Sequence, residues 1–403
     1  MYKKIILLFC LIIGVSFLCC FKLYSNSHFP DKTTVQFASW GSESEISILK
    51  PLIAEFEKEN PDINIDFMHI PQNYFQKIHL LFASNTAPDV IFVNNQYLPV
   101  YANAGVLEDL SGYKQDFEAD KFYRQSLAAL SWDDKLYAIP RDVSTLVIFY
   151  NKDIFNKYHV KYPDRNWTFK DFLNISQKLT HLPDIYGISF EEDPLFYLPY
   201  LTSNGGGFDN LLQNNSKLKI FKDESSQKAL EFYADLRNRY HVAPRKNESA
   251  SATMAQMFLQ GRLAMHLSGR WLVPKYRQEA KFDWDVVEFP KGSAGSIVPL
   301  DSSGWAVSKS SKHKKEAIKL IKYLSSKESS EQFTKSGLIV PARIDVANSD
   351  VFIDKQKPKN AKVFLDVIET STPTKVSVNY REVLDKIKAK TEYIFNSRFK
   401  ATN

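Results

Sequence analysis

The sequence predicts an α/β protein of two domains, and three observations lead to that prediction. From Thr33 onward, short runs with strand character alternate with amphipathic helical runs, which is typical of βαβ units around a mostly parallel sheet. The chain has 403 residues, whereas a single hydrophobic core stops growing near about 250–300 residues. Hydrophobic residues make up 44% and charged residues 24% of the chain, which is ordinary for a globular protein.

The alternation is clearest in the first hundred residues. Apolar side chains from Ile46 to Phe56 recur at helical spacing, and Ser42 or Ser44 precedes them as a candidate N-cap. The dipeptide Asn60-Pro61 ends that helix. Read in this way, the segment contains three strands at 33–40, 63–70 and 87–95, and three helices at 44–60, 74–85 and 95–105.

Ligands of parallel sheets bind beyond the carboxyl ends of the strands. The residues that directly follow the predicted strands are therefore the first candidates for a binding site. They are Trp40, Gly41, Ser42 and Glu43 after the first strand, and Asn94 and Asn95 after the third.

The rest of the chain is more helical. A loop rich in Gly and Ser spans 291–304, and the segment DKQKPKNAK at 354–362 is typical of an exposed linker. Helices are predicted at 168–181, 223–240, 248–260, 312–326, 328–336 and 380–398, and strands at 263–268, 284–290 and 305–310.

The N-terminus has the pattern of an export signal. Lys3 and Lys4 precede an uncharged run from Ile5 to Phe21, and an uncleaved membrane anchor is the alternative. All three cysteines, including Cys19 and Cys20, lie within this leader. The remainder therefore has no disulfide framework, cysteine-based zinc site or thiol nucleophile. We expect residues 1–27 to be a signal peptide or lipoprotein leader, with the protein exported and a lipid anchor on one of those two cysteines as one outcome.

Charge and motifs exclude several function classes. The net charge is +6, and half of it comes from leader lysines, so the pattern is too balanced for a nucleic-acid-binding protein. The sequence contains no H-E-x-x-H, P-loop or G-x-S-x-G motif. We expect no cofactor, no metal and no catalytic residue, although a glycosidase carboxylate pair is an open alternative.

Nine segments follow one another at regular intervals behind the leader. They are FASWGSESEISILKPLIAEFEKENPDINIDFMHI, APDVIFVNNQYLPVYANAGVLEDLS, WDDKLYAIPRDVSTLVIFYNKDIF, NWTFKDFLNISQKLT, LTSNGGGF, FLQGRLAMHLSGRW, WDVVEFPKG, SGWAVSKSSKHKKEAIKLIKYLSS and GLIVPAR. Together they cover essentially all of 33–345. In this order they resemble the extracellular solute-binding proteins of bacterial ABC importers, in the sugar-binding group that includes maltose-binding protein.

The resemblance implies the type II periplasmic-binding-protein fold, with two α/β lobes and a hinge that the chain crosses three times. We place the crossings near 143, 292 and 329. Lobe 1 is then expected at 31–143 plus 293–329, and lobe 2 at 144–292 plus 330–403.

A sugar site combines aromatic faces with planar polar side chains, and the resemblance suggests which residues supply them. Trp40 and Trp271 are candidate stacking platforms, while Gly206 and Gly304 would allow the backbone to approach the ligand. The structural alternatives are a sheet-end cover for Trp40, a first-turn acid favoured by the helix dipole for Glu43, a hinge ion pair for Arg141 with Asp142, and a core position for Trp305. One of Asn94 and Asn95 is the alternative turn residue, and the glycine run that contains Gly206 is alternatively a helix C-cap. The full set of candidate ligand-binding residues is Trp40, Glu43, Asn94, Asn95, Arg141, Asp142, Gly206, Arg270, Trp271, Gly304, Trp305 and Arg343.

The expected function is capture of a sugar or oligosaccharide between the lobes and delivery to an ABC permease, by a monomer that touches the membrane only through its leader. An alternative ligand is glycerol-3-phosphate or a glycerophosphodiester, if Arg141, Arg270 and Arg343 converge on a phosphate. Presentation of the ligand to a membrane sensor kinase is a further alternative, because it would use the same closed form.

Overall fold

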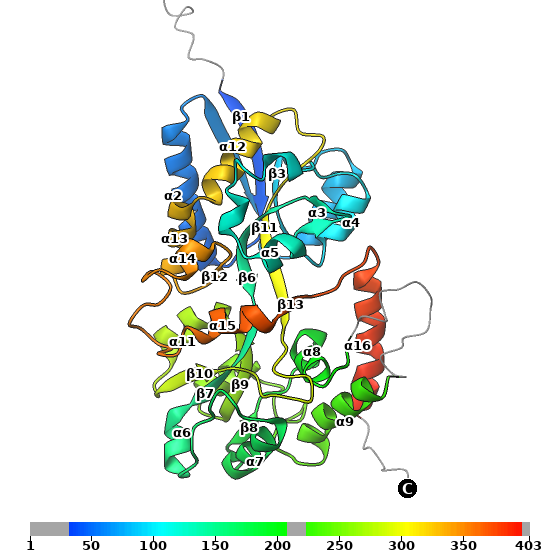
Figure 1. Cartoon of the computed structure of the whole chain (residues 1–403), viewed down its shortest axis with the longest axis vertical. Coiled ribbons are helices and arrows are strands. Elements are labelled where there is room, and N and C mark those ends of the chain that lie inside the picture. The colour runs from blue at the N-terminus through cyan, green and yellow to red at the C-terminus, as the bar shows by residue number, and fades with distance from the viewer. Residues whose placement is uncertain (1–31, 208–222, 397–403) are drawn as a thin grey trace, which may run out of the picture.

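The computed structural model describes residues 32–207 and 223–396, which form two lobes stacked along the long axis of the molecule (Figure 1). The elements from β1 to α4 lie in one lobe and those from α6 to α11 in the other. Each lobe has its own buried apolar core around its own sheet. The predicted α/β class is confirmed. The leader, with Cys19 and Cys20, lies outside the described residues.

The sheet of lobe 1 has the strand order β12-β6-β11-β3-β1-β2, with β13 paired to β11. Its first three strands along the chain are parallel, as predicted. The next three pairings are antiparallel: β11 with β3, β6 with β11, and β12 with β6. The strands are β1 (Thr33–Ser39), β2 (Ile63–His69), β3 (Val90–Asn94), β6 (Ile139–Ser144), β11 (Pro299–Val307), β12 (Val340–Pro341) and β13 (Thr372–Pro373).

The first helix of lobe 1, α2 (Glu43–Glu59), begins where the sequence predicts. The Ser42 hydroxyl accepts a hydrogen bond from the Glu45 amide, and the Glu45 carboxylate accepts one from the Ser42 amide. This reciprocal capping box satisfies two backbone donors at the helix end. The apolar stripe from Ile46 to Phe56 is buried against the sheet. The capping box therefore fixes where the residues after β1 turn into the helix.

The sheet of lobe 2 has the order β10-β7-β9-β8. Strands β7 and β9 are buried along their whole length, which explains why most of their residues are apolar. The strands are β7 (Leu146–Asn151), β8 (Tyr186–Ile188), β9 (Leu263–Gly269) and β10 (Trp284–Val287).

Helices surround both sheets (Figure 1). In lobe 1 they are α2, α3 (Tyr74–Ala83), α4 (Leu98–Asn103), α5 (Arg124–Ala129), α12 (Lys314–Leu324) and α13 (Lys327–Lys335), with α14 (Ile344–Ala347) following β12. In lobe 2 they are α6 (Lys152–Lys157), α7 (Phe169–Leu179), α8 (Pro194–Thr202), α9 (Glu224–Asn238), α10 (Met254–Leu259), α11 (Val273–Glu279), α15 (Val363–Thr370) and α16 (Tyr380–Asn396).

The chain passes between the two sheets repeatedly, and its last strand, β13, again pairs with β11. It leaves lobe 1 after β6, where Thr145 alone separates β6 from β7, and returns between β10 and β11. The third crossing follows β12, because β12 pairs with β6 in the sheet of lobe 1. Phe333 and Ile339 are also buried in the core of lobe 1. The crossing expected near 329 therefore lies after 341, and residues 330–341 belong with lobe 1.

Three local predictions differ from the structure. Strand β11 begins at Pro299, inside the segment predicted as a Gly/Ser loop, because its small residues pack between β3 and β6. Helix α15 follows the predicted linker at once, and Phe364 and Ile368 are buried in lobe 2. The helix predicted at 248–260 forms only as α10, which starts at a Thr253 capping box.

We expect Gly304→Ala to destabilise the protein. A Cβ added at Gly304 would lie 2.0 Å from the Ile139 carbonyl oxygen, a backbone atom of the neighbouring strand. Such crowding in a packed interior costs about 1–3 kcal/mol. Chemical denaturation would measure the loss, with Gly112→Ala as the control, because a Cβ at Gly112 meets no atom within 4 Å. Equal stability of the two variants would contradict the prediction.

Candidate functional site

A cavity of about 800 Å³ lies where the three parallel strands of lobe 1 end. Its wall is formed by the residues after β1, those after β2 and one residue after β3, together with one side chain from α16 of lobe 2. This is the position at which parallel α/β sheets bind ligands. The lining residues are Trp40, Gly41, Ser42, Glu43, Glu45, Pro71, Gln72, Asn73, Tyr74, Phe75, Gln76, Tyr97 and Arg381.

The cavity has an aromatic wall. The Trp40 ring is partly buried and meets the rings of Tyr74 and Phe75 edge-on, with centroids 5.7 and 5.0 Å apart. Tyr97 stacks on Phe75 at a centroid distance of 3.6 Å. These contacts lock the rings against the sheet end. Trp40 therefore both covers the end of the sheet and lines the cavity.

Polar groups stand around this wall. Glu43 is exposed at the first residue of α2, and Gln72 and Asn73 follow β2 in the same way as Trp40 follows β1. The Gly41 carbonyl oxygen lies 2.9 Å from Nε2 of His69, which steadies the loop after β1. Amide and carboxylate groups beside aromatic faces suit a neutral, hydroxyl-rich ligand.

Lobe 2 reaches this site through the first turn of α16. The Arg381 guanidinium lies 5.5 Å from the ring centroid of Tyr97, a residue of lobe 1. Arg381 also lines a second cavity of about 70 Å³ that lies between the lobes. That cavity takes Gln96 and Asp301 from lobe 1, and Asp193, Tyr380 and Lys388 from lobe 2. The two cavities share Arg381, so together they form one cleft with walls from both lobes.

Charged side chains of the second cavity already have hydrogen-bond or ion-pair partners within the protein. Asp301 accepts hydrogen bonds from Asn95 and Gln96 at 2.9 and 3.1 Å, and Lys388 lies 2.8 Å from Asp193. Burial, followed by the charges of Asp301 and Asp193, raises the pKa of Tyr380, which therefore stays a neutral phenol. Without a concentration of positive charge, the cleft offers little attraction to a phosphate.

Arg141 and Asp142 do not reach the cavity. Nε of Arg141 donates to Asp142 at 2.6 Å, and its Nη2 lies 3.1 Å from a Glu45 oxygen. Burial raises the pKa of Asp142, and although burial opposes the charge of Arg141, the two carboxylates outweigh it and raise the pKa of that guanidinium. The buried ion pair that was the alternative prediction is what the structure contains.

The other two arginine candidates are also held away from the cleft. Arg343 is buried in lobe 1 and binds Glu118 and Asp345 at 3.0 and 2.8 Å. Arg270 is only 2% exposed, and its three guanidinium nitrogens have no hydrogen-bond partner among the described residues. Its guanidinium instead lies 4.0 Å from the centroid of the Phe352 ring. Arg141, Arg270 and Arg343 therefore do not converge on one anion.

Three further candidates have structural contacts. The Asn94 side chain accepts a hydrogen bond from the Tyr97 amide and so makes the turn after β3. Asn95 is 1% exposed and bonds to Asp301 and to the Ser302 amide, which tethers that turn to β11. A Cβ at Gly206 would lie 2.4 Å from the Ser226 hydroxyl, so this glycine is needed for packing against α9.

The remaining candidates lie in the packed interior or beside it. Trp305 is fully buried between Phe37 and Phe92 in the core of lobe 1, as the core alternative predicted. Gly304 permits close contact between β11 and β6. The Trp271 ring lies over Gly269 and, although partly exposed, is not among the residues that line either part of the cleft. Among the twelve candidates, Trp40 and Glu43 thus line the cavity.

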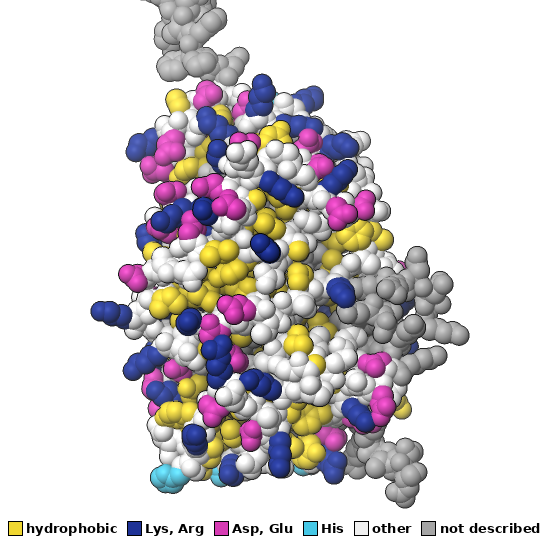
Figure 2. Space-filling view, viewed as in Figure 1, with side chains coloured by type: hydrophobic (Ala, Val, Ile, Leu, Met, Phe, Trp, Pro, Cys, Tyr) yellow, Lys and Arg dark blue, Asp and Glu magenta, His cyan; other side chains and the backbone are white. Residues whose placement is uncertain are grey.

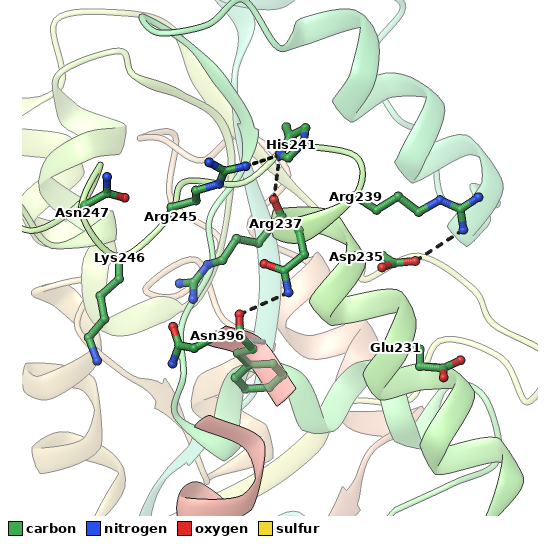
Figure 3. Close-up of a pocket in the computed structure, with 11 residues that line it drawn as sticks. Glu231, Asp235, Arg237, Arg239, His241, Arg245, Lys246, Asn247 and Asn396 are labelled. Carbon is green, nitrogen blue, oxygen red and sulfur yellow. Dashed lines mark hydrogen bonds and ion pairs between the residues drawn. The ribbon is translucent and has the colours of Figure 1, made fainter. Parts of the chain in front are cut away.

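A larger cavity, of about 1060 Å³, lies elsewhere on lobe 2, between the end of α9 and the end of α16 (Figure 3). Its basic groups are already engaged: Arg237 binds Glu192 at 2.8 Å, and Arg239 faces Asp235 at 3.7 Å. Arg245 lies against the His241 ring. Its walls come from lobe 2 alone. We therefore regard the interlobe cleft as the candidate site, although this cavity is larger.

Sequence reasoning missed most of the cleft residues. Gln72 and Asn73 follow a predicted strand, so the rule that selected Trp40 would also have selected them. Tyr97 falls in a segment predicted as helix, and no local signal distinguishes Arg381 from the other basic residues of the C-terminal helix. That arginine enters the site only because α16 packs on lobe 2 with its first turn facing lobe 1.

Three other features bear on function. Figure 2 shows basic and acidic side chains interspersed over the visible face, without a large patch of one sign. Among the described residues there is no group of His, Cys, Asp and Glu that could hold a metal ion. In the same part of the chain, no helix has both the length and the apolar character needed to span a bilayer.

The chain matches one family model and is similar in sequence to characterised proteins of that kind. Residues 51–361 match the family model of bacterial extracellular solute-binding proteins. The galactooligosaccharide-binding protein of Bacillus subtilis is 22% identical over 380 residues, which are 92% of this chain and 87% of that protein. The maltodextrin-binding protein MdxE of the same organism is 25% identical over 350 residues, or 81% and 77% of the two chains.

Among solved structures, the ABC substrate-binding protein Lmo0181 of Listeria monocytogenes, in complex with cycloalternan, superposes with a TM-score of 0.82. It is 26% identical, and the superposition covers 92% of this chain and 95% of that one. The described lobes therefore have the architecture that the order of sequence segments implied.

Proposed function

Because this chain belongs to the bacterial extracellular solute-binding proteins, we propose that it captures a neutral sugar or oligosaccharide in its interlobe cleft. The observation that carries this proposal is the composition of the cleft wall, in which Trp40 and Tyr97 offer aromatic edges and faces beside Glu43 and Gln72. Aromatic rings complement the C–H faces of a pyranose, while planar polar groups pair with its hydroxyls. The names of the two Bacillus subtilis relatives, a galactooligosaccharide-binding and a maltodextrin-binding protein, support the same class of solute.

The cleft argues against a phosphorylated polyol. Arg381 and Lys388 face Glu43, Asp193 and Asp301 across the two cavities, so the lining has no excess of positive charge. A phosphate bound there would lack the convergent arginines that such a ligand favours, because the three candidate arginines are buried at separate places. We therefore retain the sugar and set aside glycerol-3-phosphate.

In this proposal the protein works by closure. A solute that touches both lobes stabilises the conformation in which they approach each other, and a permease then receives it. An ABC permease is the partner that the family implies. The leader exports the protein in this proposal. A lipid on Cys19 or Cys20 would tether it, as a monomer, to the outer face of the cytoplasmic membrane. Binding without turnover is expected, so incubation with an oligosaccharide should leave it intact.

We predict that maltotriose or a galactooligosaccharide raises the melting temperature of the purified protein, whereas glycerol-3-phosphate does not. A ligand at 100 times its dissociation constant stabilises the state it binds by about 2.7 kcal/mol. Arg381→Ala should weaken binding about 10- to 100-fold, because a hydrogen bond to a charged group that is lost from the cleft costs about 1.5–3 kcal/mol.

The matched control is Arg239→Ala, which removes another arginine from lobe 2 that lines only the larger cavity. This variant should bind as the unmodified protein does. If only glycerol-3-phosphate raises the melting temperature, the proposed ligand is a phosphorylated solute and not a sugar. If Arg381→Ala and Arg239→Ala lower the affinity for the oligosaccharide equally, the solute does not bind in the cleft. Hydrolysis of the oligosaccharide would overturn the assignment as a binding protein.

A further inference from the structure

The loop that follows β1 is connected to the strand that crosses between the lobes by one buried carboxylate. Glu45, in the first turn of α2, has its side chain only 17% exposed. One of its oxygens accepts a hydrogen bond from the Ser42 amide at 3.1 Å. The other lies 3.1 Å from Nη2 of Arg141 on β6. A single side chain therefore touches both the cleft loop and the crossing strand.

Arg141 is held rigidly on its side of this link. Its Nε donates to Asp142 at 2.6 Å, and its guanidinium lies 4.3 Å from the ring centroid of Phe92. The Asp142 carbonyl oxygen in turn accepts a hydrogen bond at 2.7 Å from the hydroxyl of Ser302 on β11, the second crossing strand. Beyond Arg141, β6 ends at Ser144, and Thr145 alone leads into β7 of lobe 2. A rotation of lobe 2 about this connection therefore acts on the strand that carries Arg141.

We propose that Glu45 and Arg141 are positioning residues that couple the cleft loop from Trp40 to Glu43 to the crossing strands, so that the loop geometry follows the lobe arrangement. The proposal rests on the proposed function of the cleft. Because one Glu45 oxygen contacts Arg141 and the other contacts the Ser42 amide, small shifts of β6 are passed to the loop. Glu45 also lines the cavity, whereas Arg141 does not, so the effect of Arg141→Met reports the coupling without a direct contact to the solute.

The test uses Glu45→Gln, Arg141→Met and the double variant, with maltotriose as the probe in titration calorimetry. Glutamine at this position retains the capping box, so α2 keeps its start. We expect each single variant to bind about 10- to 100-fold more weakly. The double variant should bind no more weakly than the worse single variant, because both act through one contact.

The control for a merely structural effect is Arg343→Met. Arg343 is an equally buried arginine of lobe 1 that binds two carboxylates but has no contact with the cleft loop. Its loss should lower stability and leave the dissociation constant unchanged. If Arg343→Met weakens binding as much as Arg141→Met does, or if the two single effects multiply in the double variant, the coupling is refuted.

A second measurement does not depend on the solute. In the protein without maltotriose, Glu45→Gln should speed hydrogen exchange of the amides around Thr145, at the far end of the link, while the Ser42 amide stays protected by the retained capping box. Unchanged exchange at Thr145 overturns the coupling. If the unmodified protein binds no sugar while this exchange result holds, the proposed ligand fails and the coupling stands.

Discussion

Replacement of Arg270 by methionine is expected to stabilise the protein by about 1–4 kcal/mol. The guanidinium is 2% exposed and has no hydrogen-bond partner among the described residues, so its charge is buried without compensation. Burial, followed by repulsion from Arg277, lowers its pKa to about 9. A methionine would keep the contact with Phe352 and Phe364 while removing the desolvated charge. Exchange of buried charges for well-packed apolar residues is often stabilising by this amount.

The matched control is Arg277→Met, seven residues further along. Arg277 donates to Asp354 at 3.0 Å and to the Lys357 carbonyl oxygen at 2.6 Å. Its loss leaves a carboxylate and a carbonyl without their donor, so this variant should be less stable than the unmodified protein. Urea denaturation of both variants would measure the difference. A loss of stability in Arg270→Met would mean that this guanidinium is paired in solution, contrary to its contacts in the structure.

The second large effect is an acid sensitivity that resides in His266. This residue of β9 is buried, and its Nδ1 is hydrogen-bonded to the Tyr276 hydroxyl at 2.6 Å. Burial lowers its pKa to about 3, while an unfolded histidine titrates near about 6.5. Below pH 6.5 the unfolded chain therefore binds a proton that the folded chain does not. The contribution of His266 to the free energy of unfolding is complete above pH 6.5 and is lost as the pH falls towards 3.

His266→Asn should remove this loss of folding stability at low pH. The asparagine side chain can form a hydrogen bond with the Tyr276 hydroxyl in place of Nδ1, and it does not titrate. Two pH units below 6.5 correspond to about 2.7 kcal/mol. We therefore expect the stability difference between the variant and the unmodified protein to shift by about 2–3 kcal/mol in favour of the variant between pH 7.5 and 4.5. Urea denaturation at both pH values measures it. His159→Asn, which changes an exposed histidine with positive φ, should keep the acid response of the unmodified protein.

Glu191 acts in the opposite direction over part of this range. Burial, and then the charge of Asp193, raises its pKa to about 7. Its stabilising effect is complete below about 4.5 and is lost as the pH rises to 7. Between pH 4.5 and 6.5 the two groups therefore offset each other in the unmodified protein. Comparison with His266→Asn isolates the histidine because Glu191 is present in both. A pH-independent difference would contradict the assignment to His266.

The sequence predicted the parts of the fold that local patterns determine. The alternation that begins at Thr33 predicted the three parallel strands and the helices between them, and Ser42, one of the two candidate caps, is the residue that caps the first helix. Each of these features depends on neighbours within a few positions along the chain. The same holds for Trp40 and Glu43, which enter the cleft because a parallel strand ends just before them.

The arginines show why the rest of the site could not be read in this way. Arg141, Arg270 and Arg343 all stand after or within strands, and apart from Asp142 beside Arg141 nothing local separates them from a ligand-binding arginine. Their roles depend on Glu45, Phe352 and Glu118, which are distant in the sequence. Arg381, which does line the cleft, lies in a helix without a distinguishing motif. Burial and pairing of a long charged side chain are decided by tertiary packing, not by spacing.

The strand order of lobe 1 also has a consequence for how the chain acquires its structure. Strand β11 lies between β3 and β6, although it follows β6 by more than a hundred residues. The lobe that is encoded first therefore cannot close its sheet until Val307 has emerged from the ribosome. Contacts of such high sequence separation make folding slow. An exported chain of this topology therefore stays incompletely folded during most of its synthesis. In that state it can pass through a translocation channel.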